Sequence, residues 1–357
     1  MSARSTGRFD RRDFLARLPL AGAAAALGCG EARPRQAEVT PAPPEPRRVQ
    51  TALGPIALEQ LGVTLVHEHV LVDFVGAAEV SRDRYDEGEV FETVLPHLKA
   101  LGERGCQTLV ECTPAYLGRD PELLRRLSEA SGVTLITNTG YYGAANDAYV
   151  PAHAYEESAD ALAARWTREA REGLEGTGIR PGFMKIGVDA GPLSEIDRKL
   201  VLAAARCHLA TGLGAHVHTG DGVAAFEILD AFEAEGVAPS AYVWVHAQNE
   251  PDRARQIAAA ARGAWVELDG VGPETAEATA RAVSELAEAG QLGRTLVSQD
   301  AGWYHVGEPG GGDFRPFTLL FDAFLPALRA RGLGESEIRS LLVDNPAALL
   351  GAGVRAL

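Results

Sequence analysis

Short apolar segments alternate with amphipathic helical segments eight times between residues 63 and 331 of this 357-residue chain. This alternation favours parallel strands, because each helix returns the chain to the end of the sheet where the previous strand began. Units of this kind repeated over about 300 residues predict an α/β fold of the (β/α)8 TIM-barrel type. A doubly wound open sheet is the competing fold, but no Gly-x-Gly-x-x-Gly follows an early strand, which argues against dinucleotide binding. The expected strands are Val63–Val66, Thr108–Glu111, Val133–Thr137, Gly182–Ile186, Gly214–His218, Tyr242–His246, Ala264–Leu268 and Arg294–Ser298. The expected helices are Val90–Arg104, Asp120–Ser131, Tyr155–Leu174, Leu193–Thr211, Gly222–Glu235, Pro251–Arg262, Glu274–Ala289 and Phe317–Arg331.

The expected ends of these strands carry residue types that are common metal ligands. In a barrel, function gathers at the C-terminal ends of the strands. The first strand runs into His67-Glu68-His69, and because strand faces alternate, the two imidazoles point to one side. Each residue alone has a structural explanation, but together they predict a metal site at the barrel mouth. The residues at the later strand ends are His216, His218, His246 and Asp300.

Lys185 interrupts the otherwise apolar fourth strand. A buried, unpaired ammonium is costly, so this lysine either pairs with a carboxylate or serves a function. The functional interpretations are a Schiff-base lysine, a general base, or a lysine carbamylated by carbon dioxide. A carbamate would supply an anion that bridges two metal ions, and two such ions sharing one water lower its pKa.

These motifs resemble the phosphotriesterase family of the amidohydrolase superfamily, which includes the phosphotriesterase-like lactonases. The resemblance extends from about Leu53 to about Leu350. The segments that carry it are Gly62–His69, Gly118–Asp120, Thr139–Tyr142, Gly182–Ile186, His218-Thr219, His246, Ser298–Asp300 and Asp344–Ala347.

The resemblance implies a role for each ligand. His67, His69 and Asp300 would hold the more buried metal, and His218 and His246 the more exposed one. Carbamylated Lys185 would bridge the two with a hydroxide, which attacks a phosphorus or a carbonyl carbon. Asp300 would carry the proton away. Zinc is the first choice of metal, although manganese, cobalt and iron tolerate the same ligands. His216 has no place in the family's ligand set and is interpreted as packing near the site.

The substrate pocket departs from the family pattern. Family lactonases tend to carry Arg after the Leu-Asp pair of the seventh strand, whereas here Gly270 follows Leu268-Asp269. Tyr142 is expected to line the pocket. The loop from Trp303 to Phe314 contains three consecutive glycines and is expected to be a mobile lid. Its aromatic residues Trp303, Tyr304 and His305 are candidates for a leaving-group pocket.

Three classes of function follow. The first is a metal-dependent hydrolase of a small-molecule lactone, ester or phosphotriester, with an amide or phosphodiester as the alternative substrate. The second is a surface-tethered binding protein without catalysis, which the complete ligand set opposes. The third is a metal-free Schiff-base lyase that uses Lys185, which the four ligand histidines and Asp300 oppose.

The N-terminus predicts export. Arg11-Arg12-Asp13-Phe14-Leu15 is a twin-arginine motif, and an apolar run from Leu18 to Leu27 follows it. Residues 1–29 are therefore interpreted as a signal peptide. Gly28-Cys29 resembles a lipoprotein cleavage site, so lipidation of Cys29 and plain cleavage nearby are both retained. Residues 30–48 are Pro-rich and are interpreted as a disordered tether, with the barrel at 49–357. The expected location is the periplasm or a membrane anchor.

Net charge, apolar runs and cysteine count bear on which partners the chain can bind. A formal net charge of -15 gives no electrostatic reason to bind nucleic acid. No apolar run after the N-terminus is long enough for a membrane span. The cysteines beyond Cys29 are Cys106, Cys112 and Cys207, an odd number that makes a poor disulfide framework. The oligomeric state, including a homodimer, stays open.

Overall fold

The computed structural model describes residues 47–351 and 353–357. The predicted signal peptide, Cys29 and nearly all of the predicted tether lie outside these residues. Arg48, predicted as the last residue of the tether, instead begins β1 (Arg48–Thr51). This strand pairs with β2 (Gly54–Ala57) in an antiparallel hairpin that the sequence did not predict.

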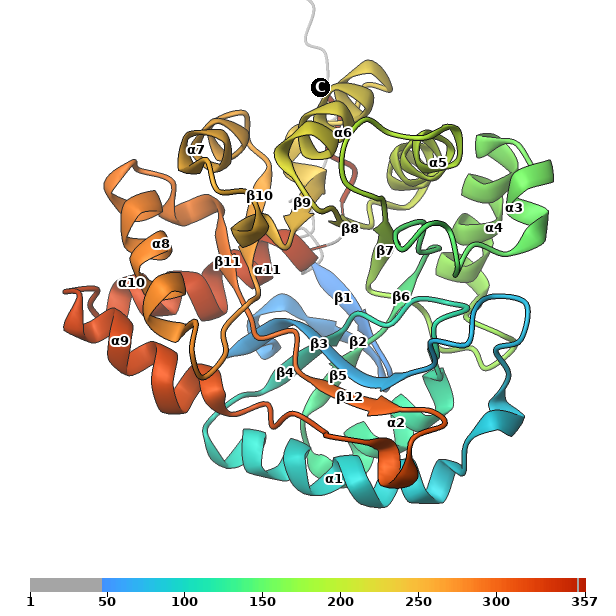
Figure 1. The fold of residues 1–357 in the computed structure, drawn as a ribbon, viewed down its shortest axis with the longest axis horizontal. Coiled ribbons are helices and arrows are strands. Elements are labelled where there is room, and N and C mark those ends of the chain that lie inside the picture. Colours follow the sequence, from blue (N-terminus) through green and yellow to red (C-terminus); the bar gives the residue numbers. More distant parts are fainter. Residues whose placement is uncertain (1–46, 352) are drawn as a thin grey trace, which may run out of the picture. The chain divides into compact units, whose positions relative to one another are not determined.

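Parallel strands form the wall of a closed barrel, shown in Figure 1 with the helices outside it. One sheet has the order β12-β3-β4-β5 and the other the order β11-β10-β9-β8-β7-β6. Only Thr137 separates β5 from β6, so these two strands are one continuous stretch of chain. The barrel closes where Asp300 N donates to His67 O (3.1 Å) and His69 N donates to Ala301 O (2.9 Å). The predicted (β/α)8 barrel is confirmed. Its strands are β3 (Thr64–Val72), β4 (Thr108–Glu111), β5 (Thr134–Ile136), β6 (Asn138–Thr139), β7 (Phe183–Gly187), β8 (Ala215–His218), β9 (Tyr242–Val245), β10 (Trp265–Leu268), β11 (Thr295–Val297) and β12 (Gly302–His305).

Side-chain caps set where the helices begin and glycines set where several of them end. Asp120 accepts hydrogen bonds from the backbone N–H groups of Glu122 and Leu123, and Asp221 accepts one from Ala224. Gly132 and Gly212 close their helices at φ of 75° and 78°, a conformation that glycine adopts without strain. No helix among the described residues is long and apolar enough to cross a bilayer. The α-helices are α1 (Glu87–Glu103), α2 (Pro121–Ser131), α3 (Ala152–Glu156), α4 (Ala159–Glu172), α5 (Glu195–Thr211), α6 (Gly222–Ala234), α7 (Arg253–Ala261), α8 (Ala276–Glu288), α9 (Leu325–Ala330), α10 (Glu335–Arg339) and α11 (Asn345–Leu350).

Two of the predicted helices are interrupted. The segment predicted as one helix over 155–174 is split, because Ser158 caps a new helix by accepting from Ala161 N. The segment predicted over 317–331 contains a π turn, Leu320–Phe324, just before Pro326. Proline has no N–H to donate, so a wider turn precedes it. The same pairing of a π turn with a proline recurs at Ser340–Asp344 and Pro346.

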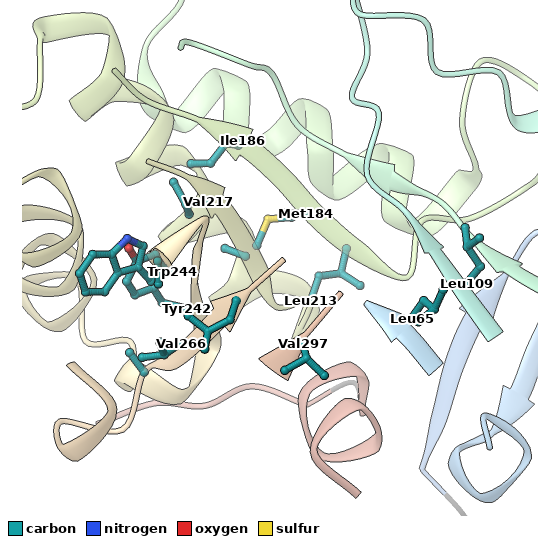
Figure 2. Close-up of a cluster of buried hydrophobic side chains, with 14 of the residues drawn as sticks. Leu65, Leu109, Met184, Ile186, Leu213, Val217, Tyr242, Trp244, Val266 and Val297 are labelled. Atoms are coloured by element: carbon teal, nitrogen blue, oxygen red, sulfur yellow. The ribbon is translucent and has the colours of Figure 1, made fainter. Parts of the chain in front are cut away.

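Side chains alternate along the strands between an outer layer and the barrel interior. The outer cluster includes Met184 and Ile186 of β7 and Trp244 of β9, which Figure 2 shows. Because successive strand residues face opposite sides, Lys185 points into the barrel. A separate apolar cluster fills part of the interior: Val66, Val243, Val245, Trp265, Leu296 and Leu349. Polar side chains in the remaining interior therefore need a specific explanation.

Two differences from the predicted strands affect the site. The first strand continues through His67 and His69 to Val72, so both imidazoles lie within β3 and not beyond its end. The predicted mobile lid begins as regular structure, because β12 pairs in parallel with β3 and aligns Gly302 with His69. The prediction of a loop starting at Trp303 is therefore wrong for residues 303–305.

Candidate metal centre

One pocket of about 150 Å³ lies at the C-terminal ends of the strands. All the side chains predicted from sequence as metal ligands line it, although they come from β3, β7 and β8 and from the segments that follow β9 and β11. The two predicted substrate contacts line it as well. The structure thus brings together His67, His69, Lys185, His218, His246, Asp300, Tyr142 and Trp303.

The two histidines of β3 are buried and are held by their Nδ1 atoms. His69 Nδ1 lies 2.8 Å from the hydroxyl of Thr113, and His67 Nδ1 lies 2.7 Å from Glu267 Oε1. The other ring nitrogens, Nε2, therefore face the pocket. Burial, followed by the charge of Lys185, lowers the pKa of His67 to about 3. Both features favour metal binding, because a neutral imidazole with a fixed tautomer is the form that coordinates metals.

Asp300 reaches the same point from the last strand. Its Oδ1 lies 3.1 Å from His69 Nε2 and 3.8 Å from His67 Nε2. This oxygen is buried and has no hydrogen bond of acceptable geometry within the described residues. Asp300 also has a positive φ of 48°, which is strained for a residue with a side chain. Strain at such a position is typical of a functional site.

Glu68 holds the segment that carries Asp300. It lies on the opposite face of β3 from the two ligand histidines and is fully buried. Its Oε1 accepts from Ser298 Oγ (2.8 Å) and its Oε2 accepts from Ala301 N (2.7 Å). Burial raises the pKa of Glu68 to about 8, although these hydrogen bonds oppose the shift. The middle residue of the His-Glu-His motif therefore anchors the last strand to the first.

His218 and His246 form the other side of the centre. Their ring centroids are 4.4 Å apart, and the hydroxyl of Tyr142 lies 2.9 Å from His218 Nδ1. His246 has a positive φ of 58°, and Asp269 fixes it by accepting from both its backbone N (3.0 Å) and its Nδ1 (2.7 Å). Tyr142 thus contacts a candidate ligand as well as lining the pocket.

Lys185 is fully buried in the pocket floor, and its Nζ lies 3.4 Å from His67 Nε2. No carboxylate among the described residues lies within 4.0 Å of this nitrogen. A buried ammonium without an anionic partner is strongly unfavourable. Conversion to a carbamate would replace this cation by an anion, so the surroundings fit the carbamylated form that the resemblance implies.

The donor set fits divalent metal ions. Ligand atoms of His67, His246 and Asp300 lie within 4.8 Å of one another, and the remaining predicted ligands border the same pocket. Imidazole nitrogens combined with carboxylate oxygens suit zinc and its first-row neighbours. Ligand atoms of His67, Glu267 and Asp269 also lie within 4.8 Å of one another, so these two carboxylates form a second cluster around the His67 ring.

The sequence did not predict three residues that support the ligands. Thr113, Glu267 and Asp269 contact the Nδ1 atoms of the ligand histidines. A signal for two of them exists: Glu267 interrupts the otherwise apolar strand β10, and Asp269, two residues later and just past its end, is expected to face the same side. His216 is also buried, and neither of its ring nitrogens has a hydrogen bond within the described residues.

Aromatic side chains form one wall of the pocket. The Trp303 ring lies 5.0 Å from the ring of His69 and 5.6 Å from that of Phe74. His305 is 5.5 Å from Phe74 but does not line the pocket, and Tyr304 is buried away from it. Of the three aromatic residues proposed for a leaving-group pocket, the structure therefore places only Trp303 in the cavity wall.

Comparisons with known proteins identify the family of the chain. The sequence profile of the phosphotriesterase family matches residues 47–350. The aryldialkylphosphatase of Saccharolobus solfataricus is 26% identical over 319 residues, which cover 82% of this chain and 95% of that protein. The organophosphorus hydrolase from Deinococcus radiodurans is 28% identical with a TM-score of 0.76, covering 86% of this chain and 97% of that one. A structure from the engineering of organophosphate hydrolysis in a weak promiscuous lactonase template is also 28% identical, with a TM-score of 0.75 and coverage of 85% and 100%. The chain is therefore a hydrolase that belongs to the phosphotriesterase family of the amidohydrolase superfamily.

Proposed function

We propose that this chain is a binuclear-metal-dependent hydrolase of lactones or other carboxylic esters, with phosphotriesters as secondary substrates. The observation that carries the proposal is the convergence of six candidate ligand side chains, from five places along the barrel wall, on one pocket. Two of the relatives support the substrate classes by name, one as an aryldialkylphosphatase and one as a lactonase template.

The ligands divide into two groups. His67, His69 and Asp300 would hold the inner metal ion, and His218 and His246 the outer one. Lys185, as a carbamate, would contribute an anionic ligand to both. When bound, two divalent ions lower the pKa of a water between them and polarise the scissile carbonyl or phosphoryl oxygen.

The chain's own residues orient the ligands and move the proton. Asp300 lines the pocket, and its Oδ1, which has no hydrogen bond of acceptable geometry within the described residues, can accept the proton that the attacking water loses. The same carboxyl can then deliver it to the leaving group. Tyr142 holds His218 by its Nδ1, so that the ring's Nε2 is available on the pocket side.

The pocket wall supports an ester with an apolar substituent. Phe74, Trp303, Tyr149 and Leu117 line the cavity beside the ligands. At the position where family lactonases carry Arg, the chain has Gly270, and a Cβ there would lie only 2.9 Å from Gln248 Nε2. Gln248 also donates to Asp269 Oδ1 (2.6 Å). The chain thus has a neutral amide, and no arginine, beside Asp269, and neither Gly270 nor Gln248 is among the residues that line the pocket.

A hydrolysis screen tests the proposed function. Protein reconstituted with zinc or manganese is assayed against lactones, aryl esters and paraoxon-type triesters. We expect lactones or esters to be hydrolysed faster than triesters, and the metal-free protein to be inactive. Two bound metals with no hydrolysis of any of these would contradict the proposed substrates, and activity that survives complete metal removal would contradict the mechanism.

We also propose that the chain is exported by the twin-arginine route and anchored through Cys29. The support is the Arg11-Arg12 motif, the apolar run and the Gly28-Cys29 pair. Globomycin blocks the signal peptidase that processes lipoproteins, so we expect treated cells to accumulate the precursor. A Cys29→Ala variant serves as the comparison, because it should no longer incorporate labelled palmitate. Normal processing under globomycin would favour plain cleavage instead.

A further inference from the structure

A buried glutamate lies directly behind one of the candidate ligands. Glu267 on β10 is fully buried, and its Oε1 lies 2.7 Å from His67 Nδ1. Its Oε2 has no hydrogen bond within the described residues and lies 4.0 Å from His216 Nδ1. A carboxylate in the barrel interior is costly unless it is paired, so its retention there calls for an explanation.

Asp269 is the competing partner of His67 but is already occupied. Its Oδ1 receives His246 Nδ1 (2.7 Å) and Gln248 Nε2 (2.6 Å), and its Oδ2 receives His246 N (3.0 Å). The distance from His67 Nδ1 to Asp269 Oδ2 is 3.1 Å, longer than the 2.7 Å to Glu267. One ring N–H can point at only one acceptor well, and the shorter contact is with Glu267. The two carboxylates therefore serve different ligands.

We propose that Glu267 is a positioning residue that accepts the Nδ1 proton of His67 and so aims the histidine's Nε2 at the inner metal position. Asp269 does the same for His246 at the outer position. A carboxylate behind a metal-binding histidine fixes its tautomer and raises its basicity, and losing such a partner typically weakens metal binding roughly 10- to 100-fold. This inference rests on the proposed metal centre, but it makes a separate prediction about the two positions.

His216 completes the arrangement. It is paired in register with Lys185 on the neighbouring strand, so its side chain also points into the barrel. Glu267 therefore lies between one imidazole that it holds and one that approaches its free oxygen.

Metal titration of the full-length protein tests the role of Glu267. Zinc is titrated in competition with a chromophoric chelator, which gives two dissociation constants per chain. In Glu267→Leu we expect one of the two sites to weaken roughly 10- to 100-fold while the other stays unchanged. In Glu267→Gln the amide oxygen can still accept from His67, so we expect a smaller loss at the same site. Asp197→Asn is the control, because Asp197 is also buried with an unpartnered oxygen but lies on α5, outside the pocket.

A second measurement does not need the metal. Nitrogen-15 NMR of histidine side chains in the metal-free protein reports which ring nitrogen of His67 carries the proton. We expect the Nδ1–H form in the wild type and in Glu267→Gln, and a loss of that preference in Glu267→Leu. If the Leu variant does not fold, the wild type and Glu267→Gln still test the proposal. A proton on Nε2 of His67 in either of these two proteins contradicts it.

The possible failures are distinguishable. Wild-type protein that binds no metal would overturn the proposed function itself. Wild-type protein that binds two metals, together with a folded Leu variant whose two constants are unchanged or equally weakened, would overturn only the role of Glu267. If Asp197→Asn weakens metal binding as much as Glu267→Leu does, the loss of affinity follows from removing any buried carboxylate, and the positioning role of Glu267 is likewise overturned.

Discussion

Replacing Asp300 by Asn is expected to lower kcat by roughly 10²- to 10⁴-fold, the range that general acid–base catalysis contributes. The amide keeps the size of the side chain but cannot accept the proton of the attacking water. Within the described residues, Asp300 Oδ1 has no hydrogen bond of acceptable geometry, and it lies 3.1 Å from His69 Nε2. Since the amide oxygen also binds a cation more weakly than a carboxylate does, metal content must be measured alongside the rate.

The Asp300→Asn experiment needs both a metal assay and a matched variant. Asp313→Asn removes an exposed carboxylate on the loop after β12 and should keep the wild-type rate. If Asp300→Asn retains two metals per chain and loses turnover with little change in KM, the carboxyl acts in proton transfer. A wild-type kcat in a metal-loaded Asn variant would remove Asp300 from the mechanism.

Replacing Lys185 by Ala is expected to reduce both bound metal and activity by more than tenfold, since losing even one partner behind a metal ligand costs roughly 10- to 100-fold. The amine is fully buried against His67, with no carboxylate partner among the described residues to keep it there as a cation. Only a carbamate turns this position into an anionic ligand. Added acetate or propionate should partly restore metal and rate, because a short carboxylate can occupy the vacated space.

Lys199→Ala is the matched lysine control for this experiment. Its Nζ donates to the carbonyls of Ala154 and Tyr155, away from the pocket, so metal and rate should be unchanged. Metal content by elemental analysis and kcat with and without acetate are the measurements. Full metal content and full rate in Lys185→Ala would refute the carbamate. A loss of metal and rate that acetate does not restore would show that Lys185 is needed, but not that it acts as an anion a short carboxylate can replace.

The candidate ligands, which the structure brings to one pocket, could be singled out in the sequence because each of them breaks a local pattern. His67 and His69 follow the two-residue period of a strand, and Lys185 stands out in an apolar one, so each could be recognised from its neighbours. The closed barrel followed from the alternation of strands with capped helices. These features depend on residues a few positions apart, which is the range over which sequence patterns are informative.

The residues that support the ligands depend on distant contacts and were missed. Glu267 meets His67 across 200 positions, and Glu68 meets Ala301 across 233. No local period reveals such partners. The β12 strand was missed for a related reason, because Gly302–His305 becomes a strand by pairing with β3, and the glycines that follow it, Gly307 and Gly310 to Gly312, favour a loop.

The anchoring of the last strand by Glu68 has a consequence for how activity appears during refolding. Asp300 reaches the other ligands only when β11 and β12 dock on β3, so the seam that completes the ring also completes the centre. Contacts between segments this far apart in the chain carry a large loop-closure entropy and tend to form late. The recovery of catalytic activity after dilution from denaturant therefore reports the pairing of the last strands, β11 and β12, with β3. It should lag behind the recovery of the helical circular dichroism signal.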